Sequence, residues 1–198
     1  MRGTHTERPD GLRAAAATLA RATGFLGAGM QAPEDRRSEM SPSAITGPFR
    51  AKVIGNGLRE LDRFLNLLTD EIAADILHPE SDHPGFSRQR NTANKVRTLR
   101  SALALPNPDH DRLRAIGRSR DCLFHCAGIV RRADTRTGRS MTSGWMGSGG
   151  TGAPVPRRFA MGERLIITAA DLAHICRFYD RIASELVAAW EARPQRIA

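Results

Sequence analysis

The sequence is poor in aromatic residues and cysteine, and it has no long apolar run. Aromatic residues make up 5% of its 198 residues, although a hydrophobic content of 40% can still form a core. No stretch of about 18 apolar residues is present, so we expect no membrane-spanning helix. Three cysteines do not suggest a disulfide framework. The short apolar part of the N-terminal region is bracketed by Arg13 and Arg21, so a cytoplasmic rather than a secreted protein is predicted.

Lysine is also scarce, although the net charge is +9. Lys52 and Lys95 are the only lysines among 30 basic residues, and all the others are arginine. The guanidinium group makes planar, forked contacts with phosphate, which favours a nucleic-acid partner. A solvated surface combined with the coding bias of a GC-rich genome would give the same composition, so charge alone does not decide between the two interpretations.

The composition and the apolar pattern of the sequence change at Pro48. Residues 1–47 mix proline, glycine, serine and charges of both signs, which predicts a flexible leader with one short Ala-rich helix near residues 11–22. From Pro48 onward, apolar residues recur at helical spacing. We therefore expect one helical domain over residues 48–190, followed by a tail at 191–198.

Four helices are predicted within this domain. The apolar periods place them at about residues 49–77, 88–105, 110–128 and 168–190. Asp109 is a suitable N-cap for the third helix, and Thr168 with Asp171 forms a capping pattern for the fourth. The predicted fold class is all-α, an up-and-down four-helix bundle.

A long insertion separates the third helix from the fourth. Residues 128–164 contain seven arginines, one aspartate and one glutamate, and they show no helical period. The segment "GSGGTGAPVP" lacks the lysine of a phosphate-binding loop and resembles a linker. We expect a flexible Gly/Arg-rich insertion, with at most a loose hairpin at its base and a short strand at 164–168.

The third helix contains a charged residue on its apolar stripe. In "RAIGRSRDCLFHCAGIV" (114–130), Arg120 occupies the step between Ile116 and Leu123 where an apolar residue is expected. A guanidinium cannot lose its charge on burial, so it needs a partner, water or a functional groove. Five residues later comes His125, whose imidazole is well suited to proton transfer near neutral pH.

The neighbours of His125 supply the other groups that RNA cleavage requires. Arg118, Asp121 and His125 lie on one face of the helix, so the Asp121 carboxylate can orient the imidazole. Arg120 lies about 140° around the helix from His125, and its long side chain could reach the same phosphate. A base, an orienting carboxylate and fixed cations are the set needed when the RNA 2′-hydroxyl attacks the adjacent phosphate. An ordinary surface ion pair is the alternative interpretation.

The stretch "RDCLFH" (120–125) resembles the signature of the HEPN superfamily, an arginine followed after four to six residues by histidine. Asp121 stands where that family usually has asparagine, and the spacing from Arg118 to His125 also fits the longest form. The family fold is a four-helix bundle with this motif on its third helix. The resemblance implies a metal-independent endoribonuclease of the toxin or defence type, without cofactor or metal, with Arg120, Asp121 and His125 as catalytic residues. It further implies RNA binding by the arginines at positions 114, 118, 131 and 132.

The same resemblance implies a homodimer in which two motifs meet in one cleft, so that Arg120 would border a dimer groove that holds RNA phosphate. An antitoxin protein is a further partner seen in the family.

Three other interpretations remain open. One is a HEPN-like domain without catalysis that serves as a nucleotide-binding or protein-interaction module, and another is an unrelated helical regulator in which the motif is accidental. Cys122, Cys126, Cys176 and His174 could hold zinc, but their spacing lacks a zinc-knuckle pattern.

Overall fold

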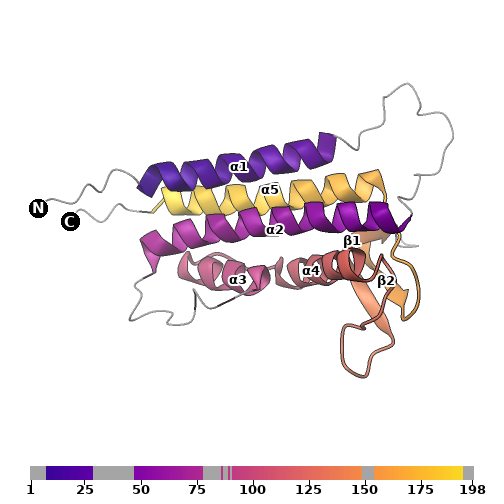
Figure 1. The fold of residues 1–198 in the computed structure, drawn as a ribbon. Coiled ribbons are helices and arrows are strands. Elements are labelled where there is room, and N and C mark those ends of the chain that lie inside the picture. Colours follow the sequence, from indigo (N-terminus) through magenta and orange to yellow (C-terminus); the bar gives the residue numbers. More distant parts are fainter. Residues whose placement is uncertain are drawn as a thin grey trace, which may run out of the picture.

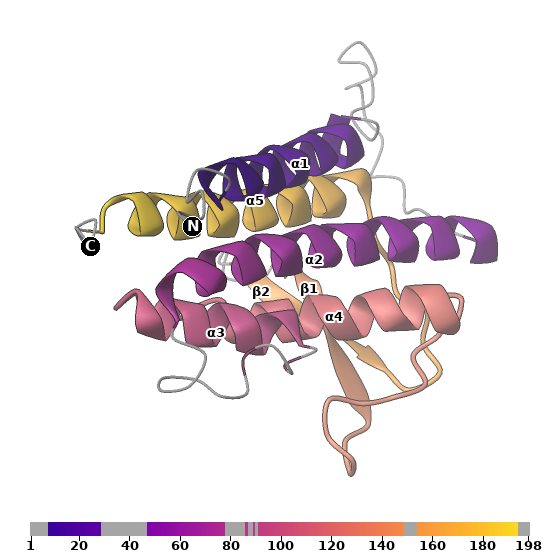
Figure 2. The same cartoon turned by 60° about the vertical axis from the view of Figure 1, so that its left-hand side comes forward.

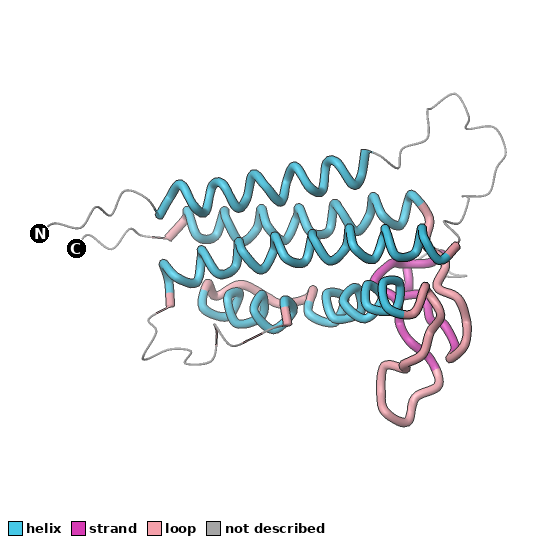
Figure 3. The backbone as a smooth tube through the Cα atoms, viewed as in Figure 1, coloured by secondary structure: helices cyan, strands magenta, loops and turns pink. Residues whose placement is uncertain are grey.

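The computed structural model describes residues 8–28, 47–77, 86, 89, 91–148 and 154–193. Within these ranges the fold is mostly helical, as predicted, but it is not purely all-α, because a two-stranded antiparallel sheet accompanies the helices (Figure 3). No helix in these ranges is both long and apolar enough to cross a membrane. The elements, in chain order, are α1 (Arg8–Ala28), α2 (Pro48–Ile76), α3 (Thr92–Ala102), α4 (His110–His125), β1 (Ser140–Ser148), β2 (Pro154–Ala160) and α5 (Ala169–Glu191).

The helices lie in four rows (Figures 1 and 2); successive rows alternate in direction along the chain, although the neighbouring rows of α5 and α2 run the same way. α1, α5 and α2 form three of the rows, and α3 and α4 lie end to end in the fourth. The short α3–α4 connection therefore joins two successive helices that run the same way, whereas the sequence predicts that they form separate antiparallel members of the bundle. α1 begins and α5 ends at one end of the bundle, and the β1–β2 hairpin lies at the other (Figure 1).

The N-terminal helix differs from the predicted mobile leader. α1 is longer than the expected 11–22 helix, it packs against both α2 and α5, and its Leu12 and Leu19 are buried. The Ala-rich sequence gives little apolar signal, but small side chains allow α1 to lie close to α2 and α5, whose apolar side chains complete the core. Residues 1–7 and 29–46 of the predicted leader, and 194–198 of the predicted tail, lie outside the described residues.

Two local features explain how α2 and α5 are positioned. A Cβ atom at Gly55 of α2 would lie 2.8 Å from the backbone nitrogen of Phe124, so glycine is what allows α2 to approach α4 this closely. The predicted cap of α5 is confirmed, because the Thr168 hydroxyl accepts from the Asp171 N–H at 3.1 Å while the Asp171 carboxylate accepts from the Thr168 N–H at 2.8 Å.

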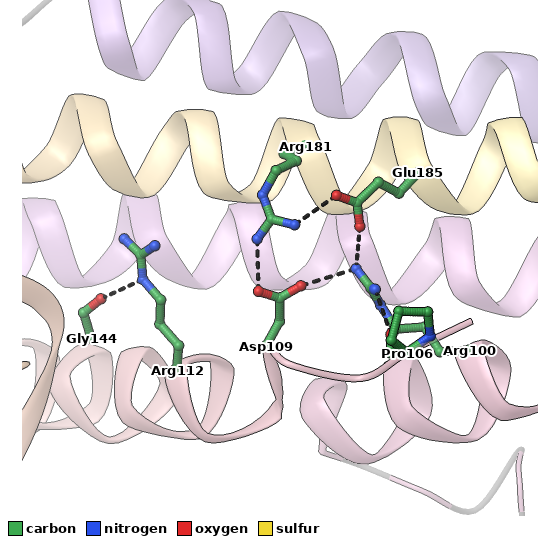
Figure 4. A network of polar contacts seen from close by, with 7 residues as sticks. All are labelled: Arg100, Pro106, Asp109, Arg112, Gly144, Arg181 and Glu185. Atoms are coloured by element: carbon green, nitrogen blue, oxygen red, sulfur yellow. Dashed lines mark hydrogen bonds and ion pairs between the residues drawn. The ribbon is translucent and has the colours of Figure 1, made fainter.

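Asp109 is at the N-cap position of α4, but its side chain does not cap the helix. Its carboxylate accepts instead from Arg100 at 3.0 Å and from Arg181 at 2.7 Å, and both arginines also donate to Glu185 (Figure 4). Burial tends to raise the pKa of Glu185, but hydrogen bonds from Arg181 and Arg100 outweigh it and lower that pKa. This closed ring of alternating charges holds the α3–α4 junction against α5.

The insertion forms an ordered hairpin rather than the expected flexible linker. β1 pairs with β2 from Ser140↔Ala160 to Ser148↔Pro154, with an irregularity between Thr142 and Met146. In that irregular segment Trp145 is fully buried, and its indole N–H donates to the Ile166 carbonyl at 3.0 Å. Residues 164–168, predicted as a strand, contribute only an isolated bridge. Residues 149–153 lie outside the described part of the chain.

Candidate functional site

α4 ends earlier than predicted, and this places His125 in its last turn. Ala127 and Gly128 have positive φ angles of 49° and 80°, and the Gly128 N–H donates to the Cys122 carbonyl at 3.1 Å. Such a left-handed pair closes a helix and turns the chain back along its side. The residues that follow can therefore line the same surface as the outward face of α4.

A groove of about 560 Å³ lies beside this outward face. It brings together five of the seven predicted site residues, from the helix and from the segment that follows it. His125 and Asp121 are exposed within it, as are the two arginines at 131 and 132. We call this the α4 groove, lined by Arg118, Asp121, Cys122, His125, Cys126, Arg131, Arg132, Ala133 and Met141.

The α4 groove is positively charged. Three arginines and one aspartate line it, which gives a balance of +2 with His125 neutral. Its arginines come from α4 and from the segment after the helix, so they face the groove from two sides. Fixed guanidinium groups on two sides of a concave surface suit a phosphate better than a neutral ligand.

A carboxylate from the insertion holds Arg118 within the groove. The Arg118 Nε lies 3.0 Å from an Asp134 oxygen, but its N–H is not aimed at that oxygen, so the contact is an ion pair without a hydrogen bond. Asp134 has other partners, because it accepts from the Thr142 N–H at 3.0 Å and from the Thr142 hydroxyl at 2.5 Å. The aspartate would therefore keep partners if Arg118 turned towards a ligand.

Asp121 does not orient His125 as the sequence predicts. Its carboxylate accepts from Arg120 Nε at 2.9 Å. Among the residues that the structure describes, none forms a hydrogen bond with the His125 imidazole. The ring of Phe124 contacts that imidazole edge to face, with 4.9 Å between the centroids.

Arg120 has its main partner within the same chain. Its Nη1 donates to Asp62 of α2 at 2.6 Å, and Asp62 also accepts from the buried Tyr179 hydroxyl of α5 at 3.3 Å. Burial would lower the pKa of Arg120, but the nearby carboxylates of Asp62 and Asp121 raise it. The charge on the apolar stripe is thus explained by a polar junction of three helices, and Arg120 is not among the residues that line the α4 groove.

This junction leads to a prediction about stability. Replacing Arg120 with leucine should lower the free energy of unfolding by about 2 kcal/mol, because the largely buried Asp62 would keep only its tyrosine partner. Urea unfolding of both proteins measures the difference. Arg114→Leu on the same helix is the matched control and should shift stability by less than about 0.5 kcal/mol, because Arg114 is exposed. Equal stability of the two variants would contradict a structural role for the Arg120–Asp62 pair.

A second set of cations flanks the α2 side of α4, and no local sequence pattern indicates it. Lys52 and Arg59 of α2 lie over the ring of Phe124, at 5.7 Å and 5.6 Å from its centroid. The close approach at Gly55 brings them there, because both residues are within one helical turn of that glycine. Phe124 thus contacts these two cations and also His125.

The remaining predicted residue, Arg114, lines a smaller groove of about 290 Å³ between α4 and the hairpin. Arg118 lines both grooves and marks where they meet. We call the smaller one the hairpin groove, lined by Asp111, Arg112, Arg114, Ala115, Arg118, Asp134, Thr142, Ser143, Gly144, Met146 and Pro156.

Cys122 and Cys176 have the properties of packed thiols. Burial raises the pKa of both Cys122 and Cys176 to about 11, which keeps them protonated at neutral pH. The Cys122 thiol donates to the Ile129 carbonyl at 3.2 Å. Within the described ranges, no three His, Cys, Asp or Glu side chains are grouped as a metal site requires.

Comparisons with known proteins return no match. No family model, no curated protein and no solved structure is significantly similar to this chain.

Proposed function

We propose that this chain is a HEPN-like, metal-independent endoribonuclease. The observation that carries the proposal is that the exposed His125 shares one groove with Arg118, Arg131 and Arg132. Two features agree with the family arrangement: helix direction alternates in chain order, with α3 and α4 together forming the third member, and "RDCLFH" lies on the helix before α5.

The chemistry that we propose uses the RNA as its own nucleophile. His125 takes the proton of the 2′-hydroxyl, the 2′ oxygen bonds to phosphorus and the bond from phosphorus to the 5′ oxygen breaks. The imidazolium returns a proton to the leaving oxygen, so no co-reactant is consumed. Arg118, Arg131 and Arg132 stabilise the negative charge that builds up on the phosphoryl oxygens.

The proposal gives the two motif arginines different roles. Arg118 and His125 face the same groove of one chain, so Arg118 is the cation available to the scissile phosphate there. Arg120 faces the other side of α4, and it can meet His125 only if a second copy supplies one of the two. The predicted homodimer therefore stays part of the proposal, together with Asp121 and Arg120 as catalytic residues, an antitoxin partner and a cytoplasmic location.

Cleavage of single-stranded RNA in the presence of a chelator tests this proposal. We expect products that end in a 2′,3′-cyclic phosphate and a 5′-hydroxyl, at the same rate with and without EDTA. A 2′-O-methyl RNA of the same sequence is the matched control and should stay intact, because its nucleophile is blocked. Activity that disappears in EDTA, or cleavage of the methylated RNA, would overturn the proposed mechanism.

One observation favours a second candidate, a HEPN-like module that binds nucleotides or proteins without cleaving them. Both motif arginines are engaged by carboxylates, Arg118 by Asp134 and Arg120 by Asp62. Such pairing reduces the charge available to a phosphate. RNA binding without any cleavage in the assay above is the result that this candidate predicts.

A further inference from the structure

The two grooves lie in succession along α4. Arg114 lines the hairpin groove, His125 lines the α4 groove, and Arg118 belongs to both. Eleven residues separate Arg114 from His125, which corresponds to about 16 Å along the helix axis. At the roughly 3.4 Å rise of stacked nucleotides, this length covers about five of them, and fewer in an extended strand.

Strand β1 of the hairpin is held rigidly against α4. A Cβ atom on Gly144 would lie 2.0 Å from Ile116 Cγ1, so β1 touches α4 at this glycine. Arg112 Nε donates to the Gly144 carbonyl at 3.1 Å (Figure 4), and its guanidinium stacks 4.2 Å from the Phe178 ring centroid. Arg112 is therefore used to fix the hairpin between α4 and α5.

Three side chains of the hairpin groove suit a nucleotide, although the carboxylates of Asp111 and Asp134 also line it. Arg114 is exposed and makes no ion pair with any residue that the structure describes. Met146 and Pro156 add apolar surface to the same groove. A cation next to an apolar wall matches the phosphate and the base of an unpaired nucleotide, whose ring faces are accessible in a single strand but not in a duplex.

We propose that the hairpin groove is a second nucleotide subsite, which binds a single-stranded RNA segment next to the phosphate held in the α4 groove. Arg114 contacts a flanking phosphate, and the adjoining base lies against Met146 and Pro156. This inference rests on the proposed function for the identity of the ligand. It assigns the hairpin to substrate binding, with Arg118 at the junction of the two subsites.

Binding of 2′-O-methyl oligoribonucleotides of two and six nucleotides tests the subsite, because these probes cannot be cleaved by 2′-hydroxyl attack. Arg114→Gln should weaken binding of the hexamer about tenfold and leave the dinucleotide unchanged. The slope of log K against log salt for the hexamer should become shallower by about 0.7, the contribution of one phosphate contact in a single strand. Fluorescence anisotropy over a salt series measures both quantities.

Two further variants sharpen the test. Arg13→Gln removes the same charge from an exposed position on α1, across the bundle from α4, and it should bind both probes like wild type. Met146→Glu introduces a negative charge on the hairpin wall and should weaken hexamer binding only. Circular dichroism checks that each variant is folded.

Equal weakening of both probes by Arg114→Gln, or no weakening at all, would overturn the subsite. If the protein cleaves RNA but Arg114→Gln binds the hexamer normally, the subsite fails and the nuclease proposal stands. If Arg114-dependent hexamer binding occurs without cleavage of unmodified RNA, the subsite stands and the nuclease proposal fails. Absence of RNA binding by the wild-type protein would overturn both.

Discussion

Replacing His125 with alanine is expected to reduce RNA cleavage by about 10²- to 10⁴-fold, the range over which a positioned acid–base group contributes to catalysis. His125 is the only histidine in the α4 groove, and the arginines around it cannot act as bases near neutral pH. Its side chain is exposed at the end of α4, so the substitution removes no core contact. Cleavage rates with saturating RNA in EDTA give the comparison.

The matched control for this prediction is His174→Ala. His174 is an exposed histidine on α5 that does not line either groove, so its removal should leave the cleavage rate within a factor of two. Binding of 2′-O-methyl RNA should survive in the His125 variant, because the arginines hold the phosphate. Wild-type activity in His125→Ala would remove the imidazole from the mechanism and leave the groove as a binding surface.

Replacing Asp109 with alanine is expected to lower the free energy of unfolding by about 3 kcal/mol. Arg100 is only 2% exposed and Asp109 7%, so the variant leaves a guanidinium in the interior with Glu185 as its remaining carboxylate partner. The substitution also removes the hydrogen bond through which Arg181 contacts the α3–α4 junction. For a chain of this length, the midpoint of thermal unfolding should fall by about 6–12 °C.

Asp111→Ala, two residues further along, is the control for Asp109→Ala. The Asp111 side chain is 99% exposed, and its 3.3 Å contact with His110 has little effect in water. Its removal should change stability by less than about 0.5 kcal/mol. A loss of under 1 kcal/mol for Asp109→Ala would show that Arg100 and Glu185 hold the junction without it.

Features that depend on neighbouring residues were predictable from the sequence. The capping box of Thr168 and Asp171 forms as expected, because both partners lie within one helical turn. The face shared by Arg118, Asp121 and His125 follows from the 3.6-residue period, and these three residues do line one groove. The apolar stripe of α2 is buried for the same reason.

Features that depend on residues distant in the sequence were not predictable. Asp62 lies 58 residues before Arg120, and nothing near either residue indicates that they pair. Asp109 has the right identity and position for a cap, but Arg100 and Arg181 compete for its carboxylate. In the insertion, the Gly/Arg-rich composition concealed the anchoring role of Trp145, whose burial depends on a surface made by other elements.

The location of the first turn of α1 and the last turn of α5 has a practical consequence for single-molecule and surface-based assays. α1 begins and α5 ends at the end of the bundle opposite the β1–β2 hairpin (Figure 1). The 23 residues of α5 span about 34 Å, so an attachment point in the first turn of α1 or the last turn of α5 is about one bundle length from the hairpin. A sensor chip or optical trap coupled through either of these turns would leave both grooves accessible to RNA in solution.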